Sequence, residues 1–544
     1  MPLRGFIAVW ERAGPIIRRV RSSFFEYPGS VFTCLLAGYI VARITILRMS
    51  AFRGWWDAFT YTPRAVPIPG RGTGPLVSFT GHAPRLWGTP LLYALLPDDL
   101  WRVRAQWVIS TVAWALLAWA LWKCLDSVLA RIVASGCVLG FALLTVVTQW
   151  DFTTLSESLS ISLGVIVVAC FLLWMRTRSR TALVAMTGAA FYWTFVRQEL
   201  RLFVVVLCAV LALVIWRRRD LRRWATGALV VILGGVGWCS VIAPTSFNTF
   251  GQYTITRLSA NSDALAFELY GIYDDPRMQR VYENDLGMPS CPAAAAVIQK
   301  HTGGLFELVD EYKKCPDLMA WGDAHGTDAV GFAIAAPDLL WERVWNVAAA
   351  GFGGRDGYGL YGSSQRFFPA RVDRFMFRSD RWGLARLFGA LLLAMVAVVA
   401  TGAYRRRRLL TVSALVLVLT SLVSEVVGFA FIDVEAARYG IQENFGVRIA
   451  LLMLVVAALD AVIERRRERR AAPSAATPQS DGPQSDGPQS DGPDQPSSDV
   501  AGQPSGDPLQ LATTSSRPNR LDDLKKVPVV VTNTATSSGG NNVG

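Results

Sequence analysis

Long apolar stretches, separated by short polar stretches rich in arginine, run through most of the chain. A membrane-spanning helix needs about 20 predominantly apolar residues, and about ten stretches approach this length. They lie at 31–47, 101–122, 130–147, 155–175, 181–196, 202–216, 225–243, 384–403, 409–432 and 447–463. The pattern therefore predicts an all-α polytopic membrane protein with about ten transmembrane helices.

Arginine clusters orient these predicted helices, because short loops rich in lysine and arginine stay in the cytoplasm. The clusters are Arg18, Arg19 and Arg21; Arg176, Arg178 and Arg180; Arg217 to Arg219 with Arg222 and Arg223; Arg405 to Arg408; and Arg465 to Arg467. If every stretch crosses the membrane once, all five clusters face the same side. We therefore expect both termini to be cytoplasmic. The segments expected outside are 48–100, 148–154, 197–201, 244–383 and 433–446, of which 48–100 and 244–383 are large extracytoplasmic loops.

The composition agrees with a membrane protein. The chain is 52% hydrophobic and 18% charged, which is typical of the membrane class. A net charge of +12 would suggest a nucleic-acid partner in a soluble protein. Here the arginines flank predicted helices, so membrane topology and anionic lipid headgroups explain the charge better, and we expect no nucleic-acid partner.

The two ends of the chain differ from the predicted membrane domain, 31–465. Residues 1–30 are basic and contain no apolar core followed by a small-residue cleavage site, so we expect a cytoplasmic segment without a cleaved signal peptide. Residues 466–544 are rich in Ser, Pro, Gly, Asp and Gln, and repeat Gln-Ser-Asp-Gly-Pro three times at 479–493. Such a sequence buries too little apolar surface to offset chain entropy, so we expect a disordered cytoplasmic tail.

Two of the eight cysteines, Cys291 and Cys315, lie in a predicted external loop. An oxidising exterior would allow a disulfide between them, closing a loop of about 25 residues and contributing about 3 kcal/mol. Free thiols are the alternative. With only His82, His301 and His325 in the chain and no metal-ligand spacing, we expect no zinc site.

The first external loop carries an acid among aromatic residues, in the run Trp55-Trp56-Asp57-Ala58-Phe59-Thr60-Tyr61. A carboxylate in such surroundings at a membrane surface can act as a general base. The alternative is an interfacial aromatic belt with an incidental Asp57.

Five short elements of the chain resemble the GT-C class of integral-membrane glycosyltransferases, in the branch of protein O-mannosyltransferases and lipid A aminoarabinose transferases. Asp57 and Tyr61 fit an Asp-x-x-x-Tyr motif after the first span. The others are a Pro/Tyr-rich run at 84–93, Thr-Leu-Ser-Glu-Ser at 154–158, Phe-Val-Arg-Gln-Glu at 195–199 and Glu-Ala-Ala-Arg-Tyr at 435–439. All five fall on the side that the arginines predict to be external. The resemblance covers the membrane portion, and residues 244–383 have no family assignment.

This resemblance implies transfer of a sugar from a polyprenyl-phosphate-linked donor to a glycan, lipid or protein acceptor on the outer face of a bacterial cytoplasmic membrane. Such a transfer needs a base for the acceptor hydroxyl and cations for the departing phosphate. Asp57 is the expected base. Arg197, Arg201 and Arg438 are the expected phosphate ligands, because guanidinium binds phosphate bidentately and keeps its charge.

The remaining candidates are Tyr61, Asp151, Glu157, Glu435 and Tyr439, which we expect to orient the acceptor. Asp151 and Glu157 can also pair with the arginines or assist a divalent cation, and whether a metal takes part stays open. Glu157 can instead be an acid favoured by a helix N-terminus, and Arg197 and Arg201 can be helix-end residues that reach toward the interface.

Three further ionisable residues have both a functional and a structural interpretation. Arg43, late in the first stretch, is a functional candidate because charges inside spans are costly, although it can also reach the outer interface. Asp98 and Asp99, shortly before the second stretch, are better explained as helix caps.

Two other functions remain as alternatives. A transporter or lipid flippase would also be a polytopic protein with charges near the membrane, although internal repeats and broken helices are typical of transporters and we find no half-to-half symmetry. A non-catalytic scaffold with the same fold is the third possibility, since fold does not imply function.

Overall fold

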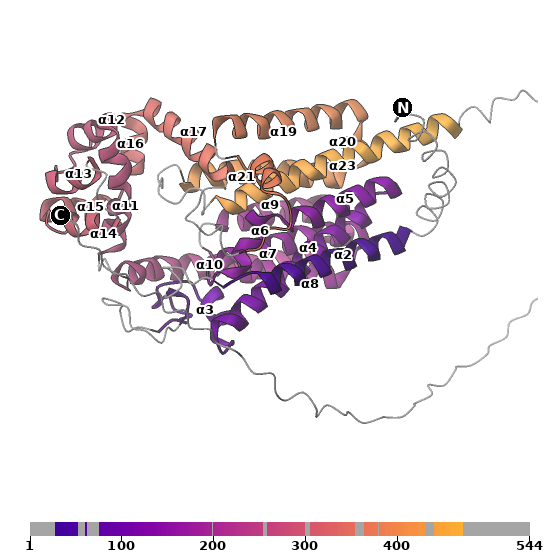
Figure 1. Cartoon of the computed structure of the whole chain (residues 1–544), viewed down its shortest axis with the longest axis horizontal. Coiled ribbons are helices and arrows are strands. Elements are labelled where there is room, and N and C mark those ends of the chain that lie inside the picture. The colour runs from indigo at the N-terminus through magenta and orange to yellow at the C-terminus, as the bar shows by residue number, and fades with distance from the viewer. Residues whose placement is uncertain are drawn as a thin grey trace, which may run out of the picture. The chain divides into compact units, whose positions relative to one another are not determined.

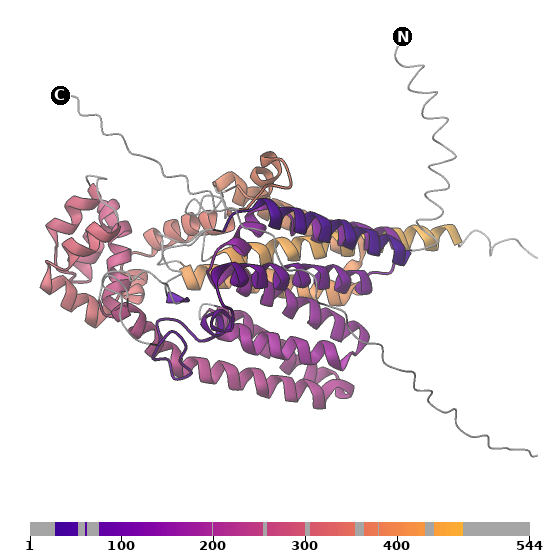
Figure 2. The same cartoon turned by 60° about the horizontal axis from the view of Figure 1, so that its bottom comes forward.

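The computed structural model describes residues 28–52, 60–62, 75–197, 200–253, 258–299, 305–353, 364–378, 380–429 and 440–471. These residues form helices joined by turns, with no strand among them (Figure 1). The long helices are α2 (Pro28–Met49), α4 (Asp99–Cys124), α5 (Val128–Phe141), α7 (Glu157–Thr177), α8 (Arg180–Thr194), α9 (Arg201–Arg217), α10 (Arg222–Tyr253), α19 (Arg381–Thr401), α21 (Arg408–Phe429) and α23 (Ile441–Ala471). They pack side by side, as both views show (Figures 1 and 2). The prediction of an all-α polytopic membrane protein is confirmed.

Among the described residues, seven helices are long and apolar enough to cross a membrane: α2, α4, α7, α10, α19, α21 and α23. Helices α8 and α9 have 15 and 17 residues, which at 1.5 Å per residue span only about 23 and 26 Å, less than the roughly 30 Å hydrocarbon core of a bilayer. The expected number of ten therefore stays a prediction.

The stretch 130–147 does not form the continuous span that its apolar composition predicts. Helix α5 ends at Phe141, and after a turn the chain continues as α6 (Thr145–Thr148) and the 3-10 helix η2 (Gln149–Phe152), bent by 57° from α5. If this bent pair crosses once, the described residues hold eight spans. Because apolar residues continue across the break, the sequence gives no sign of it.

Helices α10 and α23 extend beyond the stretches that the sequence predicts to cross the membrane, at three ends in all. Helix α10 continues ten residues past 243, to Tyr253, because Ser246 and Thr249 donate hydrogen bonds to the carbonyls of Ala83 and Gly81 at 2.9 and 3.4 Å. Helix α23 begins at Ile441, before the predicted stretch at 447–463, and residues 441–446 are buried. The predicted external side of 433–446 stays a prediction.

The C-terminal boundary of α23 also lies beyond the prediction. The helix runs to Ala471 rather than giving way to a tail at 466, since Arg406 pairs with Glu468 at 2.8 Å and holds the last turns. The tail residues from 472 onward lie outside the described residues, as do residues 1–27.

Two large hydrophobic cores organise the described chain, beside a smaller one made by Leu86, Trp87, Phe195, Cys239, Ile242 and Ala243. One runs through the long helices and includes the fully buried Trp114 and Trp174. The other is formed by short helices after α10 and contains Tyr282, Tyr312 and Phe332. These are α11 (Ala260–Asp274), α12 (Pro276–Arg280), η5 (Val281–Asp285), α13 (Pro292–Gln299), α14 (Leu305–Tyr312), α15 (Pro316–His325) and α16 (Ala329–Ala335). The predicted loop 244–383 is therefore largely a folded helical region.

Cysteines and prolines shape this helical region. Cys291 and Cys315, separated by 24 residues, form a disulfide between the start of α13 and the start of α15. Pro337 begins α17 (Pro337–Gly353), since proline suits the first turn of a helix. Helix α17 leads from the second core to the first, because its Val347 and Phe352 are buried and it packs on α19, α21 and α23.

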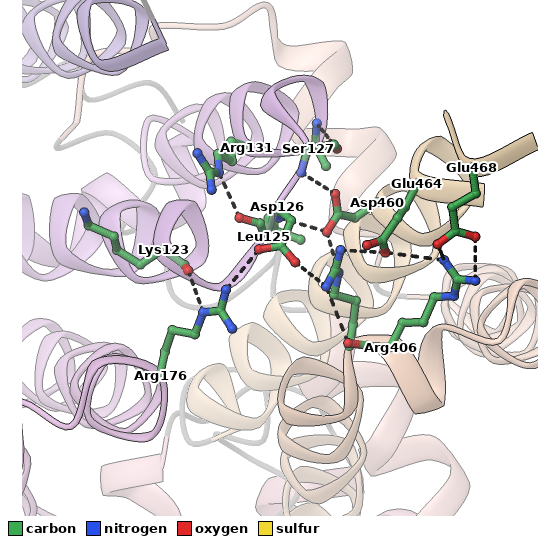
Figure 3. Close-up of polar contacts among 12 residues, drawn as sticks. Lys123, Leu125, Asp126, Ser127, Arg131, Arg176, Arg406, Asp460, Glu464 and Glu468 are labelled. Atoms are coloured by element: carbon green, nitrogen blue, oxygen red, sulfur yellow. Dashed lines mark hydrogen bonds and ion pairs between the residues drawn. The ribbon is translucent and has the colours of Figure 1, made fainter. Parts of the chain in front are cut away.

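An ionic network joins the ends of several long helices (Figure 3). Arg407 pairs with Asp126, Asp460 and Glu464 at 2.5, 2.5 and 2.9 Å. Asp460 also accepts the backbone N–H groups of Asp126 and Ser127, at 3.0 and 2.7 Å. Arg176, at the end of α7, pairs with the same Asp126 at 2.9 Å. The α4–α5 turn, the end of α7 and the start of α21 are thus tied to α23.

Other contacts bring further arginine clusters to the same end of the bundle. Arg465 donates to the carbonyl of Ala400 at 3.1 Å, and the guanidinium of Arg180 lies 4.6 Å from the ring centre of Trp224. The clusters near 176–180, 222–224, 405–408 and 464–468 therefore adjoin, as a common membrane side would require. We refer to this as the arginine end.

Candidate functional site

A buried ion pair joins the late part of α2 to η2. Arg43 Nη2 lies 2.6 Å from Asp151 Oδ2, and both side chains are at most 2% exposed. Ser158 donates to Asp151 Oδ1 at 2.6 Å. Arg43 also donates to Ser110 and Thr111 on α4, at 3.2 and 3.1 Å. Arg43 thus lies inside the bundle and orders three helices rather than reaching toward the interface.

The bend between α5 and α6 positions Asp151. Asp373, on α18 (Ala370–Met376), accepts the backbone N–H of Thr145 at 3.2 Å, and Ser364 shares a hydrogen bond with Thr148 at 2.7 Å. Burial raises the pKa of the Asp373 carboxyl. The segment 364–376 therefore holds α6 in place, and η2 presents Asp151 to Arg43.

A second buried pair lies a short way further along the chain. Glu157 is the first residue of α7, where the helix dipole favours an acid. Its Oε1 lies 3.6 Å from Nη1 of Arg197, in the turn between α8 and α9, and both side chains are at most 4% exposed. The dipole and pairing interpretations of Glu157 therefore both apply.

Residues of the first predicted external loop, 48–100, pack beside the start of α7. The hydroxyls of Tyr61 and Ser156 are 3.1 Å apart, and Tyr61 is buried. Arg85 donates to Thr60 Oγ1 at 2.9 Å and its guanidinium lies 4.9 Å from the ring centre of Tyr61. Tyr61 thus contacts the residue that directly precedes Glu157.

The Pro/Tyr-rich run at 84–93 also lies beside the start of α7. It folds into α3 (Gly88–Ala94), whose Tyr93 donates to the Leu155 carbonyl at 2.7 Å. The backbone N–H of Gly88 donates to the Phe195 carbonyl at 3.0 Å, and a Cβ at Gly88 would lie 2.6 Å from that oxygen. Only glycine allows this approach between the element at 84–93 and the turn at 195–197.

The structure therefore brings four predicted site residues together: Tyr61, Asp151, Glu157 and Arg197. Arg201 lies nearby as the first residue of α9 and is partly exposed. Asp57, Glu435, Arg438 and Tyr439 lie outside the described residues. Asp98 and Asp99 are structural, because Asp98 accepts the Trp101 N–H at 2.9 Å and Asp99 pairs with Arg102 at 2.7 Å. We call the cluster around the Arg43–Asp151 and Glu157–Arg197 pairs the polar end, since it contains the start of α7, and the other end of α7 belongs to the arginine end.

A second buried polar cluster was missed in the sequence. Ser424 on α21 donates to Glu443 on α23 at 2.6 Å, and Glu425 is buried beside them. Asn444 donates to the carbonyls of Gly351 and Phe352, each at 2.8 Å. Glu425 lies within the predicted stretch 409–432, and a charge inside a predicted span is a functional signal by default. That signal was available in the sequence.

Arg448 completes this second cluster from the next turn of α23. It donates to the Phe352 and Met376 carbonyls at 2.9 and 2.8 Å, and to Asn444. It too lies within a predicted stretch, 447–463. In the described part of the chain, no three His, Cys, Asp or Glu side chains converge on a point where they could hold a metal ion.

No known protein family, curated protein or solved structure matches the chain. The geometry of the polar end and the resemblance of its short motifs are the features of the chain that bear on its function.

Proposed function

We propose that the chain is a glycosyltransferase that moves a sugar from a polyprenyl-phosphate-linked donor to a glycan, lipid or protein on the outer face of a bacterial cytoplasmic membrane. One observation carries this proposal. Elements far apart in the sequence that resemble GT-C motifs, at 60–61, 84–93, 154–158 and 195–197, adjoin through hydrogen bonds at one end of the bundle. Motifs that serve one reaction must meet in this way.

Asp57 is the proposed general base. It lies three residues before Thr60 in the sequence, and three residues of chain span at most about 11 Å. Thr60 is buried and bonded to Arg85, and Tyr61, the last residue of the same motif, contacts Ser156 at the polar end. A base near the acceptor hydroxyl would take its proton as the hydroxyl attacks the anomeric carbon.

The departing phosphate needs cations that keep their charge. Arg197 is held beside Glu157, and Arg201 begins α9 four residues later. Guanidinium groups suit this role because they bind phosphate bidentately. We assign Arg197, Arg201 and Arg438 to the donor phosphate, and Tyr61, Asp151, Glu157, Glu435 and Tyr439 to the positioning of the acceptor.

The proposed orientation follows from the two ends of the bundle. The arginine end would face the cytoplasm, because clustered arginines in short loops remain there. The polar end would then face outward, where a lipid-linked donor and an envelope acceptor meet.

A transfer assay tests the proposal. The full chain, purified into lipid nanodiscs, is incubated with polyprenyl-phosphate sugars and a membrane extract as acceptor, and products are identified by mass. We expect transfer by the unchanged chain and its abolition by Asp57→Asn. Asp98→Asn is the matched control, because asparagine caps a helix as well as aspartate does; it should retain transfer. Full activity of Asp57→Asn would remove the proposed base.

One observation favours a second candidate, a transporter or flippase. The α5–α6 pair is bent by 57°, and broken helices are typical of transporters. Proteoliposomes containing the chain would then move a fluorescent lipid-phosphate across the bilayer without changing its mass. Lipid movement without any product of altered mass would favour this candidate over the enzyme.

A further inference from the structure

A polar stripe lies at the last turns of α21, where the helix is otherwise apolar. Ser421, Ser424 and Glu425 are all buried, with at most 3% of each side chain exposed. They face α23, where Glu443 is fully buried and Gly446 lies so close that a Cβ there would be 2.5 Å from Ser421 Oγ. The junction of the two helices is therefore lined by oxygen atoms.

The burial of the Glu425 carboxylate in this stripe is not explained by its contacts. Within the described residues, neither of its carboxylate oxygens has a hydrogen-bond partner, and neither does the hydroxyl of Ser421. Burying a carboxylate without a partner is strongly unfavourable. Glu443 is close enough for its carboxylate to act electrostatically on Glu425. A cation beside Glu425 would supply the partner that this carboxylate lacks among the described residues.

The surrounding helices fix the carboxylate of Glu425. An added Cβ at Gly351, on α17, would overlap Glu425 Oε1. Asn444 holds the Gly351 carbonyl at 2.8 Å, so α17 stays against the carboxylate. Arg448 is the arginine of α23 that lies nearest to Glu443 in the sequence. It donates hydrogen bonds to backbone carbonyls and to Asn444, and it makes no ion pair in the described part of the chain.

We propose that Glu425, Glu443 and Ser421 bind a hard divalent cation at the junction of α17, α21 and α23. Carboxylate and hydroxyl oxygens are the ligands that Ca²⁺ and similar cations prefer, and Ca²⁺ accepts six to eight oxygens at flexible angles. The inference is independent of the proposed glycosyl transfer.

The alternative to a cation is a proton shared by the carboxyl groups of Glu425 and Glu443. It explains the surroundings of Glu425 less well. A protonated Glu425 would carry an O–H group that needs an acceptor, yet its carboxyl group has no partner at hydrogen-bond distance among the described residues. A cation, by contrast, satisfies several oxygens at once. Its position would tie α17 to α21 and α23, the helices that flank segments 354–363 and 430–439.

Mn²⁺ binding to the full chain in nanodiscs, followed by electron paramagnetic resonance, tests the site. We expect one saturable Mn²⁺ per chain, displaced by Ca²⁺, and a rise in the midpoint of thermal unfolding when Ca²⁺ replaces a chelator. Glu425→Gln should weaken Mn²⁺ binding at least about tenfold, since even groups behind the ligands contribute this much. Glu307→Gln, an exposed glutamate on α14, is the matched control and should bind normally.

A second variant keeps the carboxylate and moves it. Gly351→Ala should displace Glu425 and weaken Mn²⁺ binding, whereas Gly136→Ala, where a Cβ meets no atom within 4 Å, should not. This pair decides the question even if Glu425→Gln does not fold. Absence of saturable binding to the unchanged chain, unchanged affinity in both Glu425→Gln and Gly351→Ala, or stabilisation by acid but not by Ca²⁺ would overturn the proposal.

Discussion

Buried charges at the polar end are held in pairs, and further hydrogen bonds support the pair of Arg43 and Asp151. Arg43 makes hydrogen bonds to two residues of α4 besides its ion pair, and Asp151 accepts from Ser158. Removing one partner of such a pair leaves an uncompensated charge in the interior, which is far more unfavourable than removing both.

We predict that Arg43→Met lowers the free energy of unfolding by about 3–5 kcal/mol, measured as a lower thermal midpoint of the chain in detergent. Adding Asp151→Asn should recover part of the loss, because the lone charge is removed. Arg48→Met, at an exposed position of the same helix, is the control. Equal stability of Arg43→Met and Arg48→Met would show that the pair does not stabilise the bundle.

At the level of single residues, the sequence predicted local roles better than long-range partners. The cap at Asp98 and the helix start at Pro337 depend on neighbours in the chain, so both could be predicted directly. The Arg43–Asp151 pair spans 108 positions, and only the packing of both α2 and η2 on α4 brings it together. Glu425 and Arg448 were missed because apolar composition masked single charges within predicted spans.

Among the elements, the disulfide-linked helices after α10 form a unit with their own core. The Cys291–Cys315 bond closes a loop of about 25 residues, which in the chain-entropy description contributes about 3 kcal/mol. The sequence identified both cysteines, but not the helical fold around them, because short helices in a long polar loop give no strong periodicity.

We predict that replacing both Cys291 and Cys315 with serine destabilises this region selectively. Hydrogen exchange of α13, α14 and α15 should become faster by up to about 100-fold, the equivalent of 3 kcal/mol, while exchange in α4 and α7 stays unchanged. Cys137→Ser, at an exposed thiol, should change neither. Unchanged exchange in α13–α15 would mean that the bond does not constrain the region.

Helix breaks and helix ends are the features of this fold that the sequence reveals least. The break between α5 and α6 and the extension of α10 past Pro244 both lie where composition stays apolar or where tertiary hydrogen bonds extend a helix. Composition indicates which residues leave water, and it does not indicate where a helix bends. The existence of each long helix was nevertheless predicted correctly.

For the whole molecule, the two ends of the bundle make a prediction about orientation. A cysteine placed at Arg219, exposed at the arginine end, should resist a membrane-impermeant thiol reagent in intact cells. A cysteine placed at Asp310, exposed on α14, should react. The parent chain corrects for its natural thiols. Reaction at Arg219→Cys and protection at Asp310→Cys would invert the topology and move the polar end to the cytoplasm.

Transfer of a sugar from a lipid carrier at the polar end is measured most directly by the mass of a reaction product. The full chain in nanodiscs is given each of a panel of polyprenyl-phosphate sugars with membrane acceptor. We expect that at least one donor yields an acceptor heavier by one sugar residue, and that Asp57→Asn yields none. Absence of any heavier product with every donor, from a chain that is folded and correctly inserted, would contradict the proposed function.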